Sequence, residues 1–133
     1  MMEQQNSTAA MLAIAGARYI NLESYKRDGG AVRTPVWFAA APGAAPVFYF
    51  YTTGDSFKTK RIRRNGVVKI AACDMRGNVQ GAWIAAQANI VSGADFQTGM
   101  QLLDRKYFPW KQLLGIGAFF RKRERVVMEI RSA

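Results

Sequence analysis

The chain has 133 residues, of which half are apolar and 21% are charged, and this composition fits a single globular domain over residues 1–133. It has no histidine and one cysteine, Cys73, which excludes a Ser-His-Asp triad, a Cys-His nucleophile, an imidazole-bound metal and a structural zinc. The formal net charge of +10 favours an anionic partner, such as a nucleic acid, a nucleotide cofactor, an acidic substrate or a membrane surface. If the protein is an enzyme, its reactive group is expected to come from a cofactor.

The longest apolar run, Ala9 to Ala17, is shorter than the roughly 18–20 residues that a membrane-spanning helix needs. The segment before it, Met1 to Thr8, carries no Lys or Arg, so the basic region of a signal peptide is missing. We expect a short packing helix here, capped by Ser7 or Thr8. The single cysteine cannot form an intrachain disulfide, and together these features predict a cytoplasmic protein that does not contact a membrane.

The first half of the chain has the pattern of consecutive strands. Residues Arg18 to Tyr25 alternate with the period of a β-strand, and Asp28-Gly29 is a hairpin turn signal. Ala31 to Ala40 is the expected return strand, in which Pro35 indicates a sheet edge, a bulge or a special backbone approach. Val47 to Thr53 is rich in β-branched and aromatic residues and predicts another strand.

The second half adds helices between strands. A helix is predicted from its N-cap Ser56 to the stop at Asn65-Gly66. The elements expected after it are strands over Val67 to Cys73 and Val79 to Val91, a helix from Gly93 with Phe96, Met100, Leu103 and Tyr107 on one stripe, a turn or helix from Pro109, and a strand over Arg125 to Arg131. Because hairpins dominate, we expect a mainly β (α+β) fold, an antiparallel sheet closing into a small barrel with helices over its openings.

A dense basic block lies on the helix that follows Ser56; it consists of Lys58, Lys60, Arg61, Arg63 and Arg64. Lys58 and Arg61 are three residues apart and so project from one face, in the first turns where backbone N–H groups and the helix dipole favour an anion. With the Ser56 hydroxyl they predict a compact phosphate cradle, which Lys60 extends. Two other interpretations stay open: a solvated basic face, and a nucleic-acid interface, which no further DNA- or RNA-binding pattern supports.

These blocks also resemble a known family. Tyr51-Thr52-Thr53-Gly54-Asp55-Ser56-Phe57-Lys58 resembles the Tyr-Thr-x-x-x-Ser-x-Lys phosphate-binding segment of pyridoxamine-phosphate-oxidase-like flavoproteins. Arg33-Thr34-Pro35-Val36-Trp37-Phe38 is similar to the strand on which those proteins lay the isoalloxazine ring. Two more blocks, Lys58-x-Lys60-Arg61-Ile62-Arg63-Arg64-Asn65 and Cys73-Asp74-x-Arg76-Gly77, are similar to those of the small oxidoreductases of that superfamily that use coenzyme F-420.

The resemblance implies an FMN-binding split β-barrel that forms a homodimer, with coenzyme F-420 or FMN bound at the subunit interface. It further implies that Ser56, Lys58 and Arg61 hold the phosphate, that Thr52 contacts the phosphate or ribityl chain, and that backbone of the 34–37 strand meets the ring. The expected cofactor-binding residues are Thr34, Pro35, Val36, Trp37, Tyr51, Thr52, Ser56, Lys58, Lys60 and Arg61. Trp83 is a candidate contribution from the other subunit.

Three functions follow from these observations. The first is an oxidoreductase that transfers a hydride between the cofactor, with F-420 favoured over FMN, and a small substrate. No catalytic side chain is evident, and a proton would come from water or from a tyrosine such as Tyr51. Pyridoxamine phosphate oxidase activity itself is not expected, because the Arg-x-Trp segment that holds its substrate is missing. The alternatives are a non-catalytic flavin-binding or storage protein and a basic nucleic-acid-binding module.

Overall fold

The first hairpin forms as the Asp-Gly signal predicts. The Lys26 amide donates to the Gly30 carbonyl (2.9 Å) and the Gly29 amide donates to the Lys26 carbonyl (3.0 Å). Gly29 has a φ of 89°, a left-handed conformation that glycine adopts without a steric penalty. This turn joins β1 (Tyr19–Tyr25) to β2 (Ala31–Trp37) as an antiparallel pair, which confirms the predicted hairpin.

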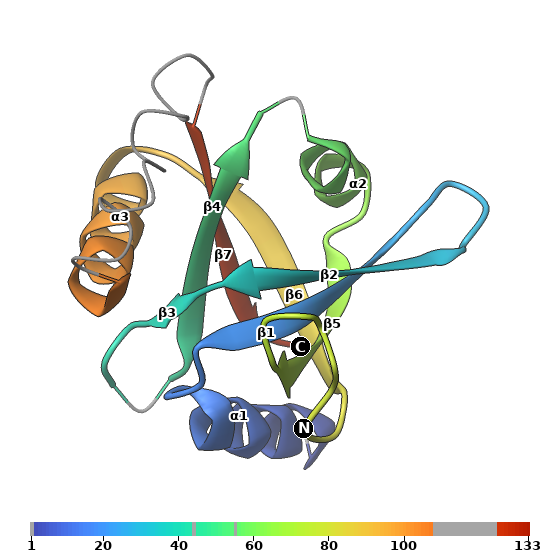
Figure 1. Ribbon diagram of the computed structural model, residues 1–133, viewed down its shortest axis with the longest axis horizontal. Helices are drawn as coiled ribbons and strands as arrows, with labels where there is room; N and C mark the ends of the chain where they lie inside the picture. The colour runs from blue at the N-terminus through green and yellow to red at the C-terminus, as the bar shows by residue number, and fades with distance from the viewer. Residues whose placement is uncertain (1, 44, 55, 108–124) are drawn as a thin grey trace.

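The computed structural model describes residues 2–43, 45–54, 56–107 and 125–133 (Figure 1). Besides the first hairpin, the described elements in chain order are α1 (Met2–Ile14), β3 (Ala39–Ala40), β4 (Val47–Thr53), α2 (Phe57–Arg64), β5 (Val67–Cys73), β6 (Ile84–Val91), α3 (Gly93–Tyr107) and β7 (Arg125–Ser132). The turn or helix expected from Pro109 lies outside the described residues. None of the helices within the described ranges is both long and apolar enough to cross a membrane.

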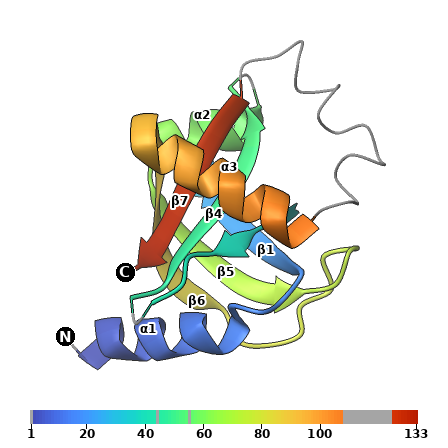
Figure 2. The same cartoon turned by 90° about the vertical axis from the view of Figure 1, so that its left-hand side faces the viewer.

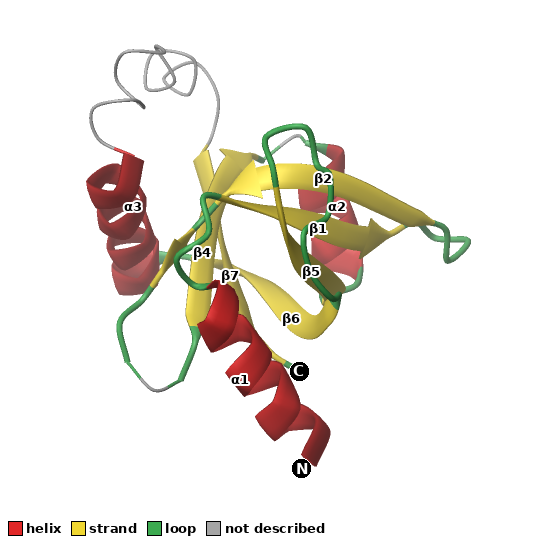
Figure 3. Ribbon diagram, turned by 60° about the horizontal axis from the view of Figure 1, so that its bottom comes forward, coloured by secondary structure: helices red, strands yellow, loops and turns green. Residues whose placement is uncertain are grey.

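The strands form one antiparallel sheet in the order β2-β1-β5-β6-β7-β4-β3. The two ends of this order, β2 and β3, are consecutive in the chain and separated only by Phe38, so the sheet curls until its ends meet there (Figure 3). The predicted return strand Ala31 to Ala40 is therefore two strands. Its first part pairs with β1, and its last two residues pair with β4. The mainly β class with flanking helices is confirmed.

The predicted strand Val79 to Val91 was too long. The Asp74 carboxylate holds a turn in its place, because Oδ1 accepts the amides of Arg76 and Asn78, both at 2.9 Å. Val79 pairs with Cys73 only through an isolated bridge, and the regular strand begins at Ile84.

The N-terminal helix is longer than predicted. It begins at Met2, so Ser7 and Thr8 lie within it and neither of them caps it. The Thr8 hydroxyl instead donates to Ser132 Oγ (3.1 Å), which ties α1 to the last strand of the sheet.

Several strands are buried on both faces, which an alternating sequence does not reveal. Residues 20–24 of β1 and residues 126–130 of β7 are buried without interruption. The largest fully buried side chains are Phe38, Phe48, Phe50, Met11, Ile20, Leu22, Ile70, Leu103, Met128 and Ile130. The polar residues Asn21 and Glu23 are thus buried, and the Asn21 amide donates to the Gly77 carbonyl (2.8 Å) of the covering 74–83 loop.

Helix α3 lies across β4 and β7 (Figure 2). Its predicted apolar stripe is confirmed, since Met100, Leu103 and Tyr107 are buried. The close approach depends on Gly99, because an added Cβ would stand 2.8 Å from Val127 Cγ1 and 2.9 Å from Tyr49 Cδ1.

Gly99→Ala is therefore expected to destabilise the fold by about 1–3 kcal/mol, the usual cost of overpacking a well-packed contact. Thermal unfolding would show a lower Tm. Gly16→Ala is the matched control, since an added Cβ at Gly16 meets nothing within 4 Å. A Gly99 variant as stable as the Gly16 variant would contradict this account of the α3 contact.

Candidate functional site

The end of β4 and the start of α2 form a tightly bonded corner. Ser56 is the N-cap, and its Oγ accepts the amide of Thr59 at 3.2 Å. The hydroxyl of Thr59, which is fully buried, donates to the Thr53 carbonyl (2.9 Å). Because that hydrogen is used, the 2.8 Å contact between Ser56 Oγ and Thr59 Oγ1 has Ser56 as its donor. Thr52 in turn donates to Ser56 Oγ at 3.4 Å.

This corner changes the expected role of Ser56. Its hydroxyl hydrogen points to Thr59, so Ser56 donates to a phosphate only after that bond is released. The donors at the helix start are the Thr52 hydroxyl, whose present bond is long, and the amides of Phe57 and Lys58, which have no intrahelical acceptor. Sequence reasoning missed Thr59, although a threonine three residues after an N-cap serine is well placed for this bond.

Thr59→Val is expected to cost about 1–3 kcal/mol of stability, because it leaves the Thr53 carbonyl and the Ser56 hydroxyl without their buried partner. Thr59→Ser keeps the hydroxyl and serves as the control in a denaturant titration. Equal midpoints for the two variants would show that the hydroxyl network does not hold the corner together.

Lys58 and Arg61 are half-buried and close to each other. Burial lowers the pKa of Lys58, and the nearby Arg61 lowers it further. Burial likewise lowers the pKa of Arg61, with Arg64 as the second cause. Neither cation forms an ion pair with a described residue. Lys58 lies in the first turn of α2 and Arg61 one turn later on the same face, so two desolvated cations without a described ion-pair partner form a site that can take an anion.

The helix is anchored to β1 in a way that orients Arg61. Arg61 Nε donates to Ser24 Oγ (2.7 Å), which leaves its other guanidinium N–H groups for an anion, and Arg64 donates to the Tyr25 carbonyl (2.8 Å). Lys60 is placed differently from the pair. It is exposed, with its Nζ 5.5 Å from the ring centroid of the exposed Phe57. The structure therefore groups Lys58 with Arg61 and sets Lys60 apart.

Strand β2 lies next to this cradle. Ser24, which holds Arg61, pairs with Val32, and Thr34 is the next residue of β2 on that face, about 7 Å further along. Val36 follows on the same face. Pro35 and Trp37 project from the opposite face, so only their backbone can contribute on the cradle side. Since β2 is an end strand of the sheet, Pro35 occupies an edge, as one of its predicted interpretations requires.

Trp37 and Tyr51 belong to a separate aromatic cluster against α3. The rings of Trp37 and Tyr107 are stacked, with centroids 4.8 Å apart and an interplanar angle of 11°. Tyr51 packs in the same cluster, and because Thr52 faces the cradle, the Tyr51 side chain faces away from it. Burial raises the pKa of Tyr51 to about 12, with Asp104 as a second cause, so this phenol is a weak acid at neutral pH.

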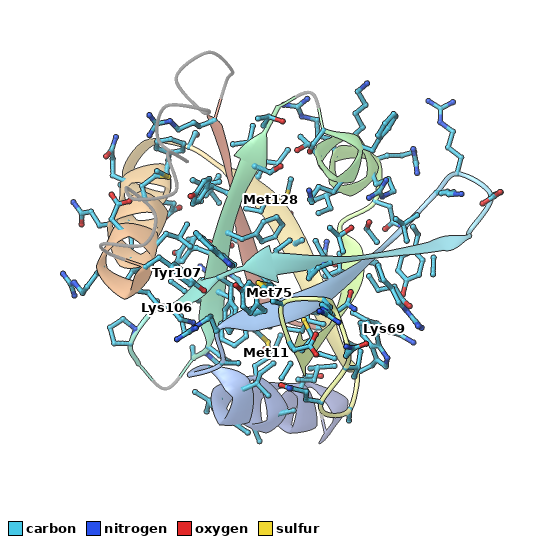
Figure 4. The ribbon with its side chains drawn as sticks, in the orientation of Figure 1. Met11, Lys69, Met75, Lys106, Tyr107 and Met128 are labelled. Atoms are coloured by element: carbon cyan, nitrogen blue, oxygen red, sulfur yellow. The ribbon has the colours of Figure 1, made fainter. Side chains whose placement is uncertain are left out.

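Tyr107 was predicted on the apolar stripe of its helix, but its hydroxyl also joins three backbone groups. It accepts from the Phe38 amide (3.0 Å) and lies 2.6 Å from the carbonyls of both Phe38 and Arg18, either of which can take its hydrogen. In Figure 4, Tyr107 lies between α3 and the β2–β3 junction. Tyr107 thus fixes the point where the sheet ends meet, next to Trp37.

Trp83 contacts its own chain, on the other side of β2. The Arg33 guanidinium carbon stands 4.6 Å from the Trp83 ring centroid, and Arg33 Nε donates to Glu23 Oε1 at 2.9 Å. A hydrogen bond from the Tyr25 hydroxyl (2.6 Å) is the main cause that lowers the pKa of Glu23, and Arg33 lowers it further. Glu23 and Arg33 are direct partners in the register of the hairpin. Because the Asp28-Gly29 turn sets that register, this pair could have been predicted from the sequence.

The described residues contain no group of three or more His, Cys, Asp or Glu side chains that could hold a metal ion. Cys73 is buried, and burial raises the pKa of its thiol, with Asp74 as a second cause. A buried thiol with a raised pKa is typical of a cysteine that packs in the core and does not react.

Neither a protein-family model nor a curated protein matches the sequence. Solved structures do match. An *Agrobacterium tumefaciens* protein of unknown function, Atu2129, superposes with a TM-score of 0.71 at 10% identity over 96% of this chain, which spans 54% of that protein's length. A *Listeria innocua* protein assigned as a pyridoxamine 5'-phosphate oxidase gives 0.56 at 15% identity, covering 96% of this chain and 90% of that one.

An F420-H2 dependent reductase gives a TM-score of 0.62 at 11% identity, covering 86% of this chain and 94% of that one. At these identities the similarity concerns the fold. The chain has the split β-barrel fold of the pyridoxamine-5'-phosphate-oxidase-like proteins.

Proposed function

We propose that this protein binds a phosphorylated flavin or deazaflavin nucleotide, F-420 in preference to FMN, and acts as an oxidoreductase on a small substrate. The observation that carries the proposal is the pair Lys58 and Arg61, two half-buried cations one turn apart on α2 that have no ion-pair partner among the described residues. Burying charge without a partner costs stability, so such a pair is best explained by an anionic ligand.

The residues present fit such a cofactor. Lys58, Arg61, the Thr52 hydroxyl and the first amides of α2 would hold the phosphate, with Arg61 kept in place by Ser24. The backbone of residues 34–37 would lie along the ring, since β2 is an edge strand on the same side of the sheet as the cradle. The bound ring would supply the hydride acceptor or donor.

The side chains around β2 would position the ring without taking part in proton transfer. Tyr107 fixes the β2–β3 junction, and Arg33 is held by the buried Glu23. Tyr51 faces away from the cradle and its pKa is raised to about 12, so a proton from water is favoured over one from Tyr51.

Preference for F-420 rests on the Lys58 to Asn65 block and on the fold shared with an F420-H2 dependent reductase. We further propose a homodimer with the cofactor at its interface. Exposed apolar side chains on the 74–83 loop, Met75 at 68% and Val79 at 41% exposure, are candidates for that contact. Sedimentation equilibrium would test the dimer, and a monomer at every concentration would contradict it.

The direct test is to titrate the purified protein with F-420 and with FMN while recording absorbance, then to assay turnover of the reduced cofactor with a panel of electron acceptors. Saturable binding with turnover supports the oxidoreductase. Saturable binding with no turnover supports a storage protein on the same fold. If neither nucleotide binds while DNA or RNA binds with a steep salt dependence, the nucleic-acid interpretation replaces the proposal.

A further inference from the structure

A cavity lies apart from the phosphate cradle. It has a volume of about 570 Å³, within the range of small-molecule sites, and lies between the end of α1, the chain from β3 onwards and α3. Residues 39–41, all alanine, line one side, with Leu12 of α1 and Leu102 of α3 beside them. In Figure 1, α1 lies at the bottom, α3 at the left and α2 at the upper right. None of the described residues of the cradle lines this cavity, so the two sites are separate.

Of the described side chains that line this cavity, the two polar ones are both cationic. Arg105 is exposed, and Lys106 is half-buried and points from α3 towards the start of β1 (Figure 4). Lys106 Nζ donates to the Ala17 carbonyl and stands 4.0 Å from the centroid of the Phe38 ring, so its position is fixed. Among the residues that the structure describes, no acidic side chain lines the cavity.

Lys106 forms no ion pair with a residue in the described part of the chain. Burial lowers the pKa of Lys106 to about 8, and the neighbouring Arg18 adds to the effect. A carboxylate close to Nζ would act in the opposite direction. The cavity therefore combines an apolar wall with an ammonium and a guanidinium that can both donate hydrogen bonds to an anion.

We propose that this cavity binds a small organic monoanion with an apolar body, such as an aliphatic carboxylate of about eight carbons. The chain would lie against the alanines of residues 39–41, between Leu12 and Leu102, and the carboxylate would meet Lys106 and Arg105. Because Lys106 and Arg105 are both cationic, the cavity should bind this anion more tightly than a cationic or a neutral molecule of the same length. The site stands independently of the proposed cofactor function.

Octanoate binding, measured by isothermal titration calorimetry, tests the proposal, with octyltrimethylammonium and octanol as probes of the same chain length. Octanoate is expected to bind at one site, and the other two probes at least tenfold more weakly. Lys106→Met keeps the length of the side chain and removes its charge, so it should weaken octanoate binding about tenfold.

Gly16→Phe fills the cavity. Gly16 lines it, is not in a positive-φ conformation, and has open space where a Cβ would be built. The variant is expected to abolish octanoate binding while leaving nucleotide binding unchanged. Gly81→Phe is the matched control, since Gly81 also faces open space but does not line the cavity. No octanoate binding to the unmodified protein, equal binding of the three probes, or equal binding to the two glycine variants would overturn the proposal.

Discussion

The double variant Lys58→Ala/Arg61→Ala is expected to lose at least about 100-fold in affinity for FMN or F-420. Each charge-assisted hydrogen bond to a phosphate contributes about 1.5–3 kcal/mol, and every 1.4 kcal/mol is about tenfold in Kd. Fluorescence titration at fixed ionic strength measures the effect. The size of the loss follows from the half-buried position of both cations, where water screens them less than it screens exposed charges.

The same helix offers a matched control, Lys60→Ala/Arg63→Ala. It removes the same net charge at the same three-residue spacing, but both side chains are exposed. We expect a change within about threefold, because exposed charges contribute little. If the two double variants lose affinity equally, a diffuse basic surface binds the nucleotide and the cradle does not. If the control alone loses affinity, Lys60 holds the phosphate.

Replacing Lys58 should lower the affinity for the nucleotide without lowering the stability of the fold. Its pKa is lowered in the folded state, so its charged form is disfavoured by folding at neutral pH. Lys58→Ala alone is therefore expected to leave Tm unchanged or to raise it. A lower Tm would show that Lys58 supports the fold, and its buried charge would then need no ligand to explain it.

The second large effect is expected at Tyr107. Tyr107→Phe keeps the stacking on Trp37 but removes the hydroxyl that joins the Phe38 amide to the carbonyls of Phe38 and Arg18. Leaving a buried polar group unsatisfied costs about 1–3 kcal/mol, and more than one group loses its partner here, so about 2–4 kcal/mol is expected in a denaturant titration. Tyr19→Phe is the control, because the Tyr19 hydroxyl forms no hydrogen bond with a described residue.

Loss of the Tyr107 hydroxyl should also weaken nucleotide binding at the proposed cofactor site. The junction that it fixes directly follows the 34–37 strand, so a weaker junction should reduce nucleotide affinity with the phosphate cradle intact. Affinity for inorganic phosphate alone is expected to stay the same. A Tyr107→Phe protein as stable as Tyr19→Phe would contradict the role given to this hydroxyl.

Local signals predicted the elements whose ends are set by local chemistry. The bounds of β4 and β5 match the sequence prediction, and α2 is capped at Ser56 and ends before Asn65 as expected. In each case the deciding residues are neighbours in the sequence: a cap serine, a helix stop, or a run of β-branched side chains.

Features set by tertiary contacts escaped prediction. The break at Phe38 arises because one continuous segment pairs with two different strands, and alternation along that segment does not show which partner each half takes. Burial of Asn21 and Glu23 depends on the 74–83 loop, and the bonds of Tyr107 join residues 69 and 89 positions apart. The proximity of Lys58 and Arg61 was predictable because they share a helix, whereas Ser24, which orients Arg61, lies 37 positions away.

The most direct test of the phosphate cradle compares two ligands that share a ring. FMN and riboflavin differ only in the phosphate. The ratio of their dissociation constants for the unmodified protein therefore measures how much affinity the phosphate contacts contribute. The account predicts that FMN binds at least about 100-fold more tightly than riboflavin, and that Lys58→Ala/Arg61→Ala removes most of that difference. Equal affinities for FMN and riboflavin would contradict it.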